Sequence, residues 1–390
     1  MEIKDALSDV VSKIPSSGIR KFFDLANQME DVISLGVGEP DFDTPWRIRE
    51  AAIYSIERGL TFYTENQGLL ALRQEISRFH RDKHHVRYDP KEEILVTVGG
   101  SEAIDLALRS LLNPGDEVIV LEPSYVAYIP SITLSGGKAV TITLQASKQF
   151  KLQPEQLRQA ISDKTKAIVL NYPSNPTGGC MTQEDYEKLV PILKESGIMI
   201  ISDEIYSALS YETDFCSIAA FDTIKDQVII ISGFSKSHAM TGWRLGYVCA
   251  HPIILQAMNK IHQYVVMSAP TAGQYGAIEA IKNCEAEVEQ MRQSYELRRN
   301  YLVQAFNAMG LTTFLPQGAF YIFPDITATG LTSEQFCQQL LEQHAVACVP
   351  GTAFGRSGEG HIRVSYAYSI EQLKVAVQRI EQFVMNIHKI

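Results

Sequence analysis

The middle of the chain alternates short apolar runs with segments of helical periodicity. Most of the runs are apolar at consecutive positions, which is typical of strands that are covered on both faces. We expect seven such strands, at Ile94–Val98, Val118–Leu121, Ala139–Leu144, Ala167–Leu170, Ile198–Ile201, Val228–Ile231 and Leu245–Ala250. Helices are expected between them, one after Gly99-Gly100 and one from Thr182 to Ser196. This repeated order predicts a mainly parallel α/β sheet.

The pattern changes after about residue 285. A long helix with a polar face is expected from Ala286 to Met309, and the strand candidates then become sparse, at Ala319–Phe323, Val346–Val349 and His361–Ser365. Ser369-Ile-Glu-Gln372 reads as a capping box that opens a last helix, whose apolar stripe contains Leu373, Val377, Ile380 and Val384. The sequence therefore predicts a smaller α+β domain after the sheet.

Composition and charge exclude several classes of protein. The 390 residues are 45% hydrophobic and 21% charged, and 35 basic against 45 acidic residues give a net charge of −10. A nucleic acid or an anionic membrane would need a basic face. No apolar run approaches the roughly 18–20 residues of a membrane span, and the first residues lack the apolar core of a signal peptide.

The cysteines and histidines give no sign of a metal site. The six cysteines form no CxxC pair, and His84-His85 is a lone pair in a charged stretch. We therefore expect reduced thiols in a cytoplasmic protein without a metal.

Candidate chemistry follows the strands, because ligands of open α/β sheets bind beyond the carboxyl ends of strands. Gly99-Gly-Ser-Glu102 has the small residues and the helix start that can hold a phosphate, although a tight turn with Ser101 as the N-cap is an equal reading. Asn175 stands in a loop that two prolines and two glycines fix into turns. Asp203 comes directly after an apolar strand, so it is either the N-cap of a helix or a buried carboxylate that needs a cationic partner.

The most informative segment is Ser232–Gly246, where Lys236 and Arg244 stand eight residues apart among serines, glycines and an indole. A lysine near a fixed arginine and a phosphate cradle can have a lowered pKa and form a Schiff base. If this segment stood alone, Lys236 would be better interpreted as an exposed lysine in a loop. Together with Asp203 and Asn175, these are the groups that pyridoxal phosphate requires.

Six motifs then resemble those of class I/II aminotransferases, which are fold-type-I pyridoxal phosphate enzymes. They cover nearly the whole chain in the family's order, and they are Gly38–Phe42, Tyr63–Gly68, Asn175–Gly178, Ser202–Tyr206, Ser235–Gly246 and His361–Ser365. The opening Ser17–Ala26 is most similar to the bacterial branch of aromatic, alanine and N-acetyl-diaminopimelate aminotransferases. The resemblance implies a large cofactor-binding domain at 45–285 around a mainly parallel seven-stranded sheet, and a small α+β domain made of 1–44 and 286–390.

The resemblance also implies roles for the residues that would hold the cofactor. Lys236 matches the Schiff-base lysine, Asp203 the partner of the pyridinium nitrogen, and Asn175 and Tyr206 the pair on the phenolic oxygen. Arg244, Ser235 and the amides of Gly100 and Ser101 match the phosphate ligands. Gly233 stands where the family often has another serine, so either Ser232 or Ser235 could bind the phosphate.

Four further residues match positions that surround the cofactor and the substrate. Tyr125 matches the aromatic residue that stacks on the cofactor ring, with a core aromatic as the alternative. Arg363 matches the arginine that clamps the substrate α-carboxylate, near which Asn175 is also expected, and Gly38 matches a backbone contact to the same group. Tyr63 matches a tyrosine that reaches the phosphate of the neighbouring subunit, which implies a homodimer; its alternative is a core aromatic of its own chain.

The activity that the resemblance implies is ping-pong transfer of an amino group from an L-amino acid to a 2-oxo acid, with Lys236, Asp203 and Tyr206 as the catalytic residues. A neutral or aromatic donor and 2-oxoglutarate as acceptor are favoured. An aspartate-type enzyme would need a second cation, for which Arg20 is a candidate if it is not in a surface ion pair.

Two alternatives belong to other classes. A C–S β-lyase on the same fold would usually vary the loop around Asn175 and the stretch after Lys236, which this chain keeps as Asn-Pro-Thr-Gly and Met-Thr-Gly-Trp-Arg. A non-enzymatic regulator would carry a basic DNA-binding domain, but only about thirty residues precede Val32–Val37.

Overall fold

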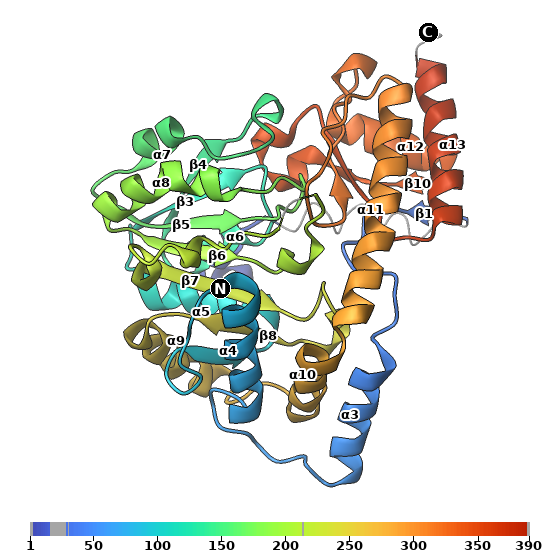
Figure 1. Cartoon of the computed structure of the whole chain (residues 1–390). Helices are drawn as coiled ribbons and strands as arrows, with labels where there is room; N and C mark the ends of the chain where they lie inside the picture. Colours follow the sequence, from blue (N-terminus) through green and yellow to red (C-terminus); the bar gives the residue numbers. More distant parts are fainter. Residues whose placement is uncertain (1–2, 16–28, 30, 213, 388–390) are drawn as a thin grey trace.

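The computed structural model describes residues 3–15, 29, 31–212 and 214–387. The predictions for Arg20 and for the motif 17–26 lie outside these residues. A seven-stranded sheet in the order β2-β8-β7-β6-β5-β3-β4 forms the centre of the molecule (Figure 1). Its strands are β2 (Ile94–Thr97), β3 (Glu117–Glu122), β4 (Lys138–Thr143), β5 (Thr165–Asn171), β6 (Met199–Asp203), β7 (Val228–Gly233) and β8 (Gly246–Cys249).

The predicted sheet is confirmed. Strand β8 runs antiparallel to both of its neighbours, and all other adjacent pairs are parallel. Successive strand residues enter different cores: Ile200 of β6 packs into one apolar cluster and Ile201 into another. Because both faces of the strand are covered, consecutive rather than alternating positions are apolar.

Helices cover both faces of this sheet. Residues of α4 (Leu70–His84), α8 (Gln183–Ser196) and α10 (Thr271–Asn283) join the cluster that contains Ile200. Residues of α5 (Gly99–Leu111), α6 (Tyr128–Leu134) and α9 (Pro252–Val265) join the cluster that contains Ile201. Within the described residues, the other α-helices before α11 are α1 (Asp9–Lys13), α3 (Trp46–Glu57) and α7 (Pro154–Ala160).

Helix starts decide two of the alternatives that the sequence left open. Helix α5 begins at Gly99, whose φ of +72° lets the chain turn directly from strand to helix, so Ser101 lies inside the first turn and is not the N-cap. Asp203 is the last residue of β6 and no helix starts there, because a turn and a 3-10 helix (Ser207–Leu209) follow. By contrast, Thr182 caps α8 through a capping box with Asp185, close to the predicted start.

The long helix α11 (Glu285–Ala308) leads away from the sheet, as predicted, and lies beside α13 (Ile370–Ile387) in Figure 1. Ser369 and Gln372 form the expected hydrogen bonds at the start of α13. Its predicted apolar stripe packs into a separate core, which also contains residues of α11 and α12 (Ser333–His344).

The prediction of one strand over Val346–Val349 is wrong. Val346–Ala347 is β10 and pairs in parallel with β1 (Ile33–Ser34), whereas Val349–Pro350 is β11 in a three-stranded antiparallel sheet. The chain changes its pairing partner at Cys348, between the two strands. The other two strands of that sheet lie within the predicted ranges, at β9 (Tyr321–Ile322) and β12 (Ile362–Ser365).

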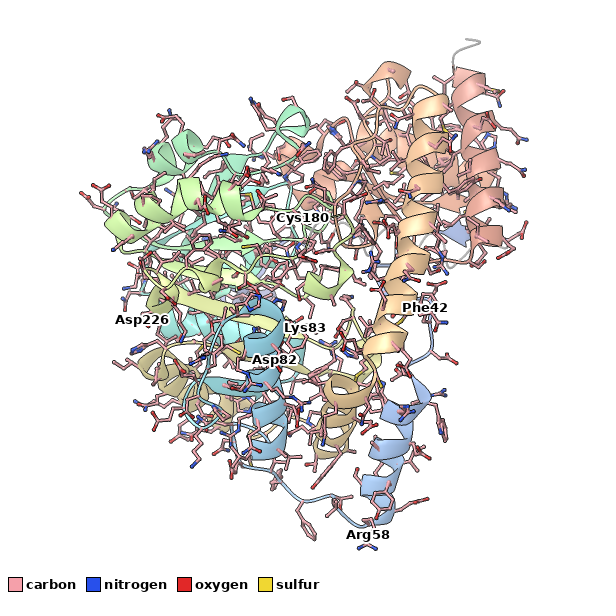
Figure 2. The ribbon with its side chains drawn as sticks, viewed as in Figure 1. Phe42, Arg58, Asp82, Lys83, Cys180 and Asp226 are labelled. Atoms are coloured by element: carbon pink, nitrogen blue, oxygen red, sulfur yellow. The ribbon has the colours of Figure 1, made fainter. Side chains whose placement is uncertain are left out.

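The N-terminal segment before α3 also packs on α11. Phe42 lies beside this helix in Figure 2. Its ring meets the Tyr295 ring edge-on, with 5.5 Å between centroids, and lies 5.2 Å from the guanidinium carbon of Arg298. Among the described helices, none is long and apolar enough to cross a membrane.

Candidate active site

Strands β5, β6 and β7 are parallel neighbours, so their carboxyl ends meet at one edge of the sheet. Asn171 at the end of β5 organises this edge. Its side-chain nitrogen donates to the Asp203 backbone carbonyl at 3.2 Å, and its side-chain oxygen accepts from the Asn175 amide at 2.9 Å. Asn171, which the sequence analysis did not single out, therefore holds Asp203 and Asn175 together.

Lys236 follows β7 and reaches the N-terminal segment, where its Nζ donates to the Gly38 carbonyl at 2.6 Å. Burial lowers the pKa of the Lys236 amine to about 8, opposed by the charge of Glu39 and helped by Arg363 and Arg244. About a tenth of this amine is then uncharged at pH 7, far more than for an ordinary lysine with a pKa of about 10.4. An uncharged amine at this place can attack an aldehyde or carry a proton.

Asp203 is a buried carboxylate with two hydrogen-bond donors. The Tyr128 hydroxyl donates to one oxygen at 2.7 Å, and the Ile205 amide donates to the other at 3.2 Å. Burial raises the pKa of Asp203 despite these donors and the nearby Lys236 charge. A cationic group docked on this carboxylate would favour its ionised form, and a protonated pyridine nitrogen has this chemistry.

Arg363 brings a buried guanidinium from β12 to the same edge. Its Nη1 donates to the Asn175 side-chain oxygen at 2.9 Å and its Nη2 donates to the Gly36 carbonyl. Its Nε is buried and has no partner among the described residues. Because a guanidinium has five N–H donors, Arg363 retains donors for a carboxylate ligand.

Tyr321 was missed by the sequence reasoning, which treated it only as part of a strand. Its hydroxyl lies 2.8 Å from the Tyr206 hydroxyl, and its ring lies 4.4 Å from the Arg363 guanidinium carbon. Burial raises the pKa of Tyr206 far above its ordinary value, so both phenols are neutral donors. A Cβ on Gly38 would collide with the Tyr321 hydroxyl, which explains why this position needs glycine.

A cradle for an anion lies at the N-terminus of α5. A Cβ on Gly99 would stand 2.6 Å from the Arg244 Nη2, and one on Gly246 would stand 2.6 Å from the Gly99 backbone. Arg244 is itself left-handed (φ +52°) and donates from Nη1 to the Thr241 carbonyl at 2.9 Å. The first-turn amides, among them those of Gly100 and Ser101, have no acceptor within the helix and so favour an anion there.

The structure separates the two candidate phosphate serines. The hydroxyl of Ser232 is hydrogen-bonded to Tyr247, whose own hydroxyl lies 3.1 Å from the His80 Nε2 on α4. Ser235 is buried one residue before Lys236. Ser232 is therefore engaged on the α4 side of the sheet, which leaves Ser235 as the candidate.

The two remaining aromatic candidates differ sharply in exposure. Tyr125 is partly buried, with its hydroxyl hydrogen-bonded to Ser101 and its ring edge-on to Tyr128 at 5.5 Å. Tyr125 thus lies between Ser101, at the anion cradle, and Tyr128, whose hydroxyl donates to Asp203. Tyr63 is 80% exposed, so it does not belong to the core of its own chain, and the core-aromatic alternative is wrong.

Comparison with known proteins identifies the family. The family "Aminotransferase class I and II" matches residues 30–380. This chain belongs to it. Accordingly, the enzyme is an aminotransferase of the fold that the motifs indicated.

Similar proteins differ in the substrate that their names state. YugH of Bacillus subtilis, named as an aminotransferase without a substrate, is 50% identical over 377 residues, covering 97% of this chain and 98% of YugH. An aspartate aminotransferase of Pyrococcus abyssi is 42% identical over 380 residues, covering 97% and 98%. The crystal structure of an aromatic aminotransferase from Pyrococcus horikoshii matches with a TM-score of 0.90 at 41% identity, covering 94% of this chain and 99% of that one.

Proposed function

We propose that this chain is a pyridoxal-phosphate-dependent aminotransferase that moves the amino group of a neutral or aromatic L-amino acid to 2-oxoglutarate. One observation carries the proposal: Asp203, Arg244 and Arg363 lie close enough to the Lys236 amine for their charges to act on it, and burial lowers the pKa of this amine to about 8. Each of these four groups suits a different part of the cofactor or of the amino-acid substrate. Lys236 suits an aldehyde, Asp203 a pyridine nitrogen, Arg244 a phosphate and Arg363 a carboxylate.

The donor set fits pyridoxal phosphate, which when bound supplies an electron sink for charge that develops at the substrate Cα. In our proposal each part of the cofactor has partners from this chain. Lys236 would form the covalent link and Asp203 would pair with the ring nitrogen. Asn175 and Tyr206 would donate to the phenolic oxygen, Tyr125 would stack on the ring, and Arg244, Ser235 and the amides of Gly100 and Ser101 would hold the phosphate.

The substrate side of the site is built by Arg363, Asn175 and the backbone at Gly38. Arg363 fixes the α-carboxylate with its free N–H donors, and this orients the Cα–H bond toward Lys236. Lys236, once free of its hydrogen bond to Gly38, would take the Cα proton as general base and would deliver it as general acid to the carbon that carried the aldehyde. Tyr206 would donate from its neutral hydroxyl, and Asp203 would keep the ring nitrogen protonated.

The donor preference rests on the side chains around the site. Tyr125 and Tyr321 offer apolar ring surface beside Arg363 and Ser101, which suits a neutral or aromatic side chain. The similar proteins named for aspartate and for aromatic substrates support either choice, so an aspartate-type enzyme is the second candidate. The C–S β-lyase alternative is not favoured, because these similar proteins are named as aminotransferases.

We also propose that the enzyme is a cytoplasmic homodimer. Exposed apolar side chains gather on α3 and on the chain that follows it, namely Trp46, Ile53, Tyr54, Ile56, Phe62 and Tyr63. The turn between α9 and α10 is tied to this segment, since Thr271 donates to the Phe62 carbonyl and Asn66 to the Met267 carbonyl, both at 2.8 Å. Arg58 marks the outer end of α3 in Figure 2. An apolar patch of this kind is typical of a protein interface, and all six cysteines are free thiols, which suits a reducing compartment.

A panel of amino donors tests this function. Holoenzyme is mixed with one L-amino acid at a time, without a 2-oxo acid, and the loss of the cofactor's visible band is followed in a single half-reaction. We expect the fastest bleaching with a neutral or aromatic donor, recovery of the band with 2-oxoglutarate, and no bleaching in Lys236→Ala. Fastest bleaching by aspartate would establish the second candidate. Turnover of cysteine conjugates to pyruvate and ammonia in place of bleaching would contradict the aminotransferase.

A further inference from the structure

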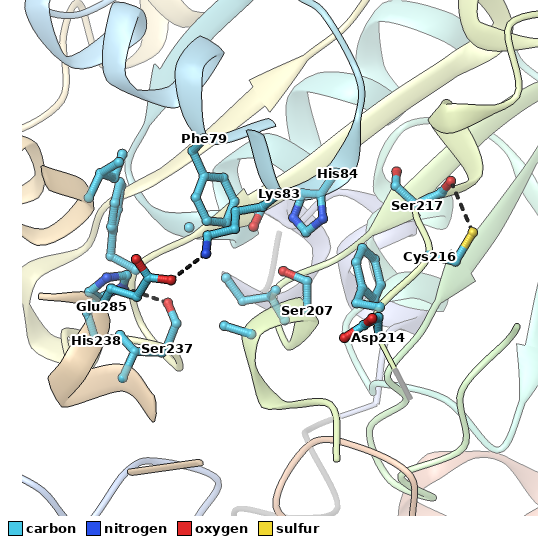
Figure 3. A pocket seen from close by; sticks show the side chains of 18 of the residues that line it. Phe79, Lys83, His84, Ser207, Asp214, Cys216, Ser217, Ser237, His238 and Glu285 are labelled. Carbon is cyan, nitrogen blue, oxygen red and sulfur yellow. Dashed lines mark hydrogen bonds and ion pairs between the residues drawn. The ribbon is translucent and has the colours of Figure 1, made fainter. Parts of the chain in front are cut away.

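A cavity of about 1160 Å³ lies on the far side of the segment that carries Lys236. It is enclosed by the end of α4, the loop after β6, the end of α10 and the first turn of α11 (Figure 3). Its volume is slightly above the roughly 300–1,000 Å³ of ordinary ligand pockets, so it is large enough for a small molecule. Among the described residues that line it, none is a residue that we propose for the cofactor or the amino acid.

His84 is the group in this cavity that points to a ligand. Its side chain is 9% exposed, and neither ring nitrogen has a partner among the described residues. Figure 3 shows the His84 ring facing the hollow, with Ser207 and Asp214 across from it. Burial lowers the pKa of His84 to about 4, so the ring is neutral and offers one N–H donor and one acceptor. Leaving both unpaired in the interior is costly.

A second, partly buried histidine of the cavity shows the contrast. The Nδ1 of His238 lies 2.8 Å from the Ser237 hydroxyl, and its ring also hydrogen-bonds the Ala280 backbone. His238 is therefore satisfied by the protein itself. The unpaired state of His84 is a property of that position and not of the cavity wall in general.

The wall around His84 is aromatic and aliphatic. The Phe79 and Phe215 rings meet the His84 ring edge-on, at 5.1 Å and 5.0 Å between centroids. Ile205 and Val288 add aliphatic surface from the loop after β6 and from α11. A flat ring is the ligand shape that such a wall packs best.

The charges of the cavity are balanced by their neighbours. Lys83 is ion-paired with Glu285 at the rim, as the dashed line in Figure 3 shows. Glu289 is ion-paired with Arg292 at 2.8 Å. Asp214 is exposed to water at the rim. Burial lowers the pKa of His84 and of His238 to about 4, so both rings are neutral. Among the described residues that line the cavity, no buried side chain therefore offers an unpaired charge to a charged ligand.

We propose that this cavity is a second binding site, for a neutral aromatic molecule that carries an amide or hydroxyl group. The ring packs between Phe79, Phe215 and Ile205, and the polar group pairs with one nitrogen of the His84 ring. Such an occupant contacts the segments that hold the reaction site, since Ser237 directly follows Lys236 and Ile205 directly precedes Tyr206.

Benzamide is the probe, because its amide carries both an acceptor and a donor, so it can pair with either the N–H or the unprotonated nitrogen of the neutral His84 ring. It is titrated into holoenzyme at neutral pH by calorimetry and by ligand-observed NMR. We expect saturable binding that is weakened at least tenfold in His84→Leu, which keeps the bulk of the side chain and removes its nitrogens. Ala208→Trp should abolish the binding by filling the cavity, and it keeps the test decisive if His84→Leu fails to fold.

Two comparisons locate the binding. His344→Leu, on α12 and outside the cavity, is the matched control and should bind benzamide like the wild type. Arg363→Lys should also leave benzamide binding unchanged, because it alters only the site proposed for the amino acid. Absence of binding, equal affinity in the wild type and in both cavity variants, or a loss confined to Arg363→Lys would each overturn the proposal.

Discussion

Arg363 and Asn175, 188 positions apart in the chain, are joined by a hydrogen bond of 2.9 Å from Nη1 to the side-chain oxygen. The Asn175 amide is held in turn by Asn171 at the end of β5. The residue proposed for the substrate carboxylate and a residue proposed for the cofactor therefore position each other. Strand β12, which carries Arg363 and lies late in the chain, therefore helps to position Asn175, which follows β5.

Replacing Arg363 with lysine should weaken the amino-acid half-reaction and leave the cofactor in place. Lysine keeps the charge but loses the planar fork, and a hydrogen bond to a charged group contributes roughly 1.5–3 kcal/mol. We expect kcat/KM for the donor to fall by at least about tenfold, measured by stopped-flow bleaching. Arg158→Lys on the exposed face of α7 is the control. A collapse of cofactor content instead would make Arg363 a structural or phosphate residue.

Gly99→Ala should weaken cofactor binding selectively. A residue with a side chain at φ +72° is strained by roughly 1–2 kcal/mol, and the new methyl group would stand 2.6 Å from the Arg244 Nη2. We expect the dissociation constant of the cofactor to rise by about tenfold, measured by fluorescence titration of the apoenzyme. Gly100→Ala is the matched control, because its Cβ would meet only the Ile231 methyl at 3.7 Å. Equal effects of both changes would contradict the proposed cradle.

Tyr63 should act in the site of the neighbouring subunit. It is 80% exposed in one chain, on the surface that we propose as the dimer interface. In a mixed dimer of one Lys236→Ala subunit and one Tyr63→Phe subunit, action across the interface places both lesions in one site. The other site is then intact, so about half of the wild-type activity per dimer should return.

The control for this experiment is a mixed dimer of Lys236→Ala with wild type, which should show the same half activity. If Tyr63 acts within its own chain, the test dimer keeps only the weaker Tyr63→Phe rate. A chain that is monomeric at working concentration, by analytical ultracentrifugation, would contradict the dimer itself.

Glu204 should make the folded state less stable as the pH rises. Its carboxylate is buried beside the hydroxyls of Ser202 and Ser217, one of its oxygens has no partner among the described residues, and burial raises its pKa to about 7. The folded state therefore holds a proton that the unfolded state has already lost. Stability falls as the pH rises from about 4.5 to about 7, and it then stays lower.

Glu204→Gln removes this titration. We expect the variant to exceed the wild type by on the order of 1–3 kcal/mol at pH 8 and to match it near pH 5, from denaturant unfolding across this range. Glu342→Gln, an exposed residue of α12, should follow the wild type at every pH. A difference between the wild type and Glu204→Gln that is constant with pH would show that Glu204 does not titrate in this range.

The sequence predicts the sheet well because its strands carry their own signal. Ile200 and Ile201 enter two different cores, so continuous apolar runs mark the buried strands without any knowledge of their partners. The chemistry-bearing residues are equally visible, since Asp203 ends such a run and Lys236 follows another. Local pattern and motif together named Asp203, Asn175 and Arg363, which the structure brings together at this edge, but not every residue there.

The residues that the sequence reasoning missed act through contacts between distant segments. Tyr128 binds Asp203 over 75 positions, and Tyr321 meets Tyr206 over 115 positions. The prediction of one strand over Val346–Val349 failed for the same reason. Strand β10 pairs with β1, where Ile33 lies opposite Val346, and no pattern near Val346 indicates this distant partner. Periodicity reports which side chains are buried, but it does not report what they are buried against.

The central claim is that Lys236 holds the cofactor covalently. The purified protein should be yellow, and its visible band should change with pH. Reduction with borohydride, digestion and mass spectrometry of the peptides locate the attached group directly. This account predicts one pyridoxyl group per chain, on Lys236, and none in Lys236→Ala. A pyridoxyl group on any other lysine, or a protein that takes up no pyridoxal phosphate, would contradict it.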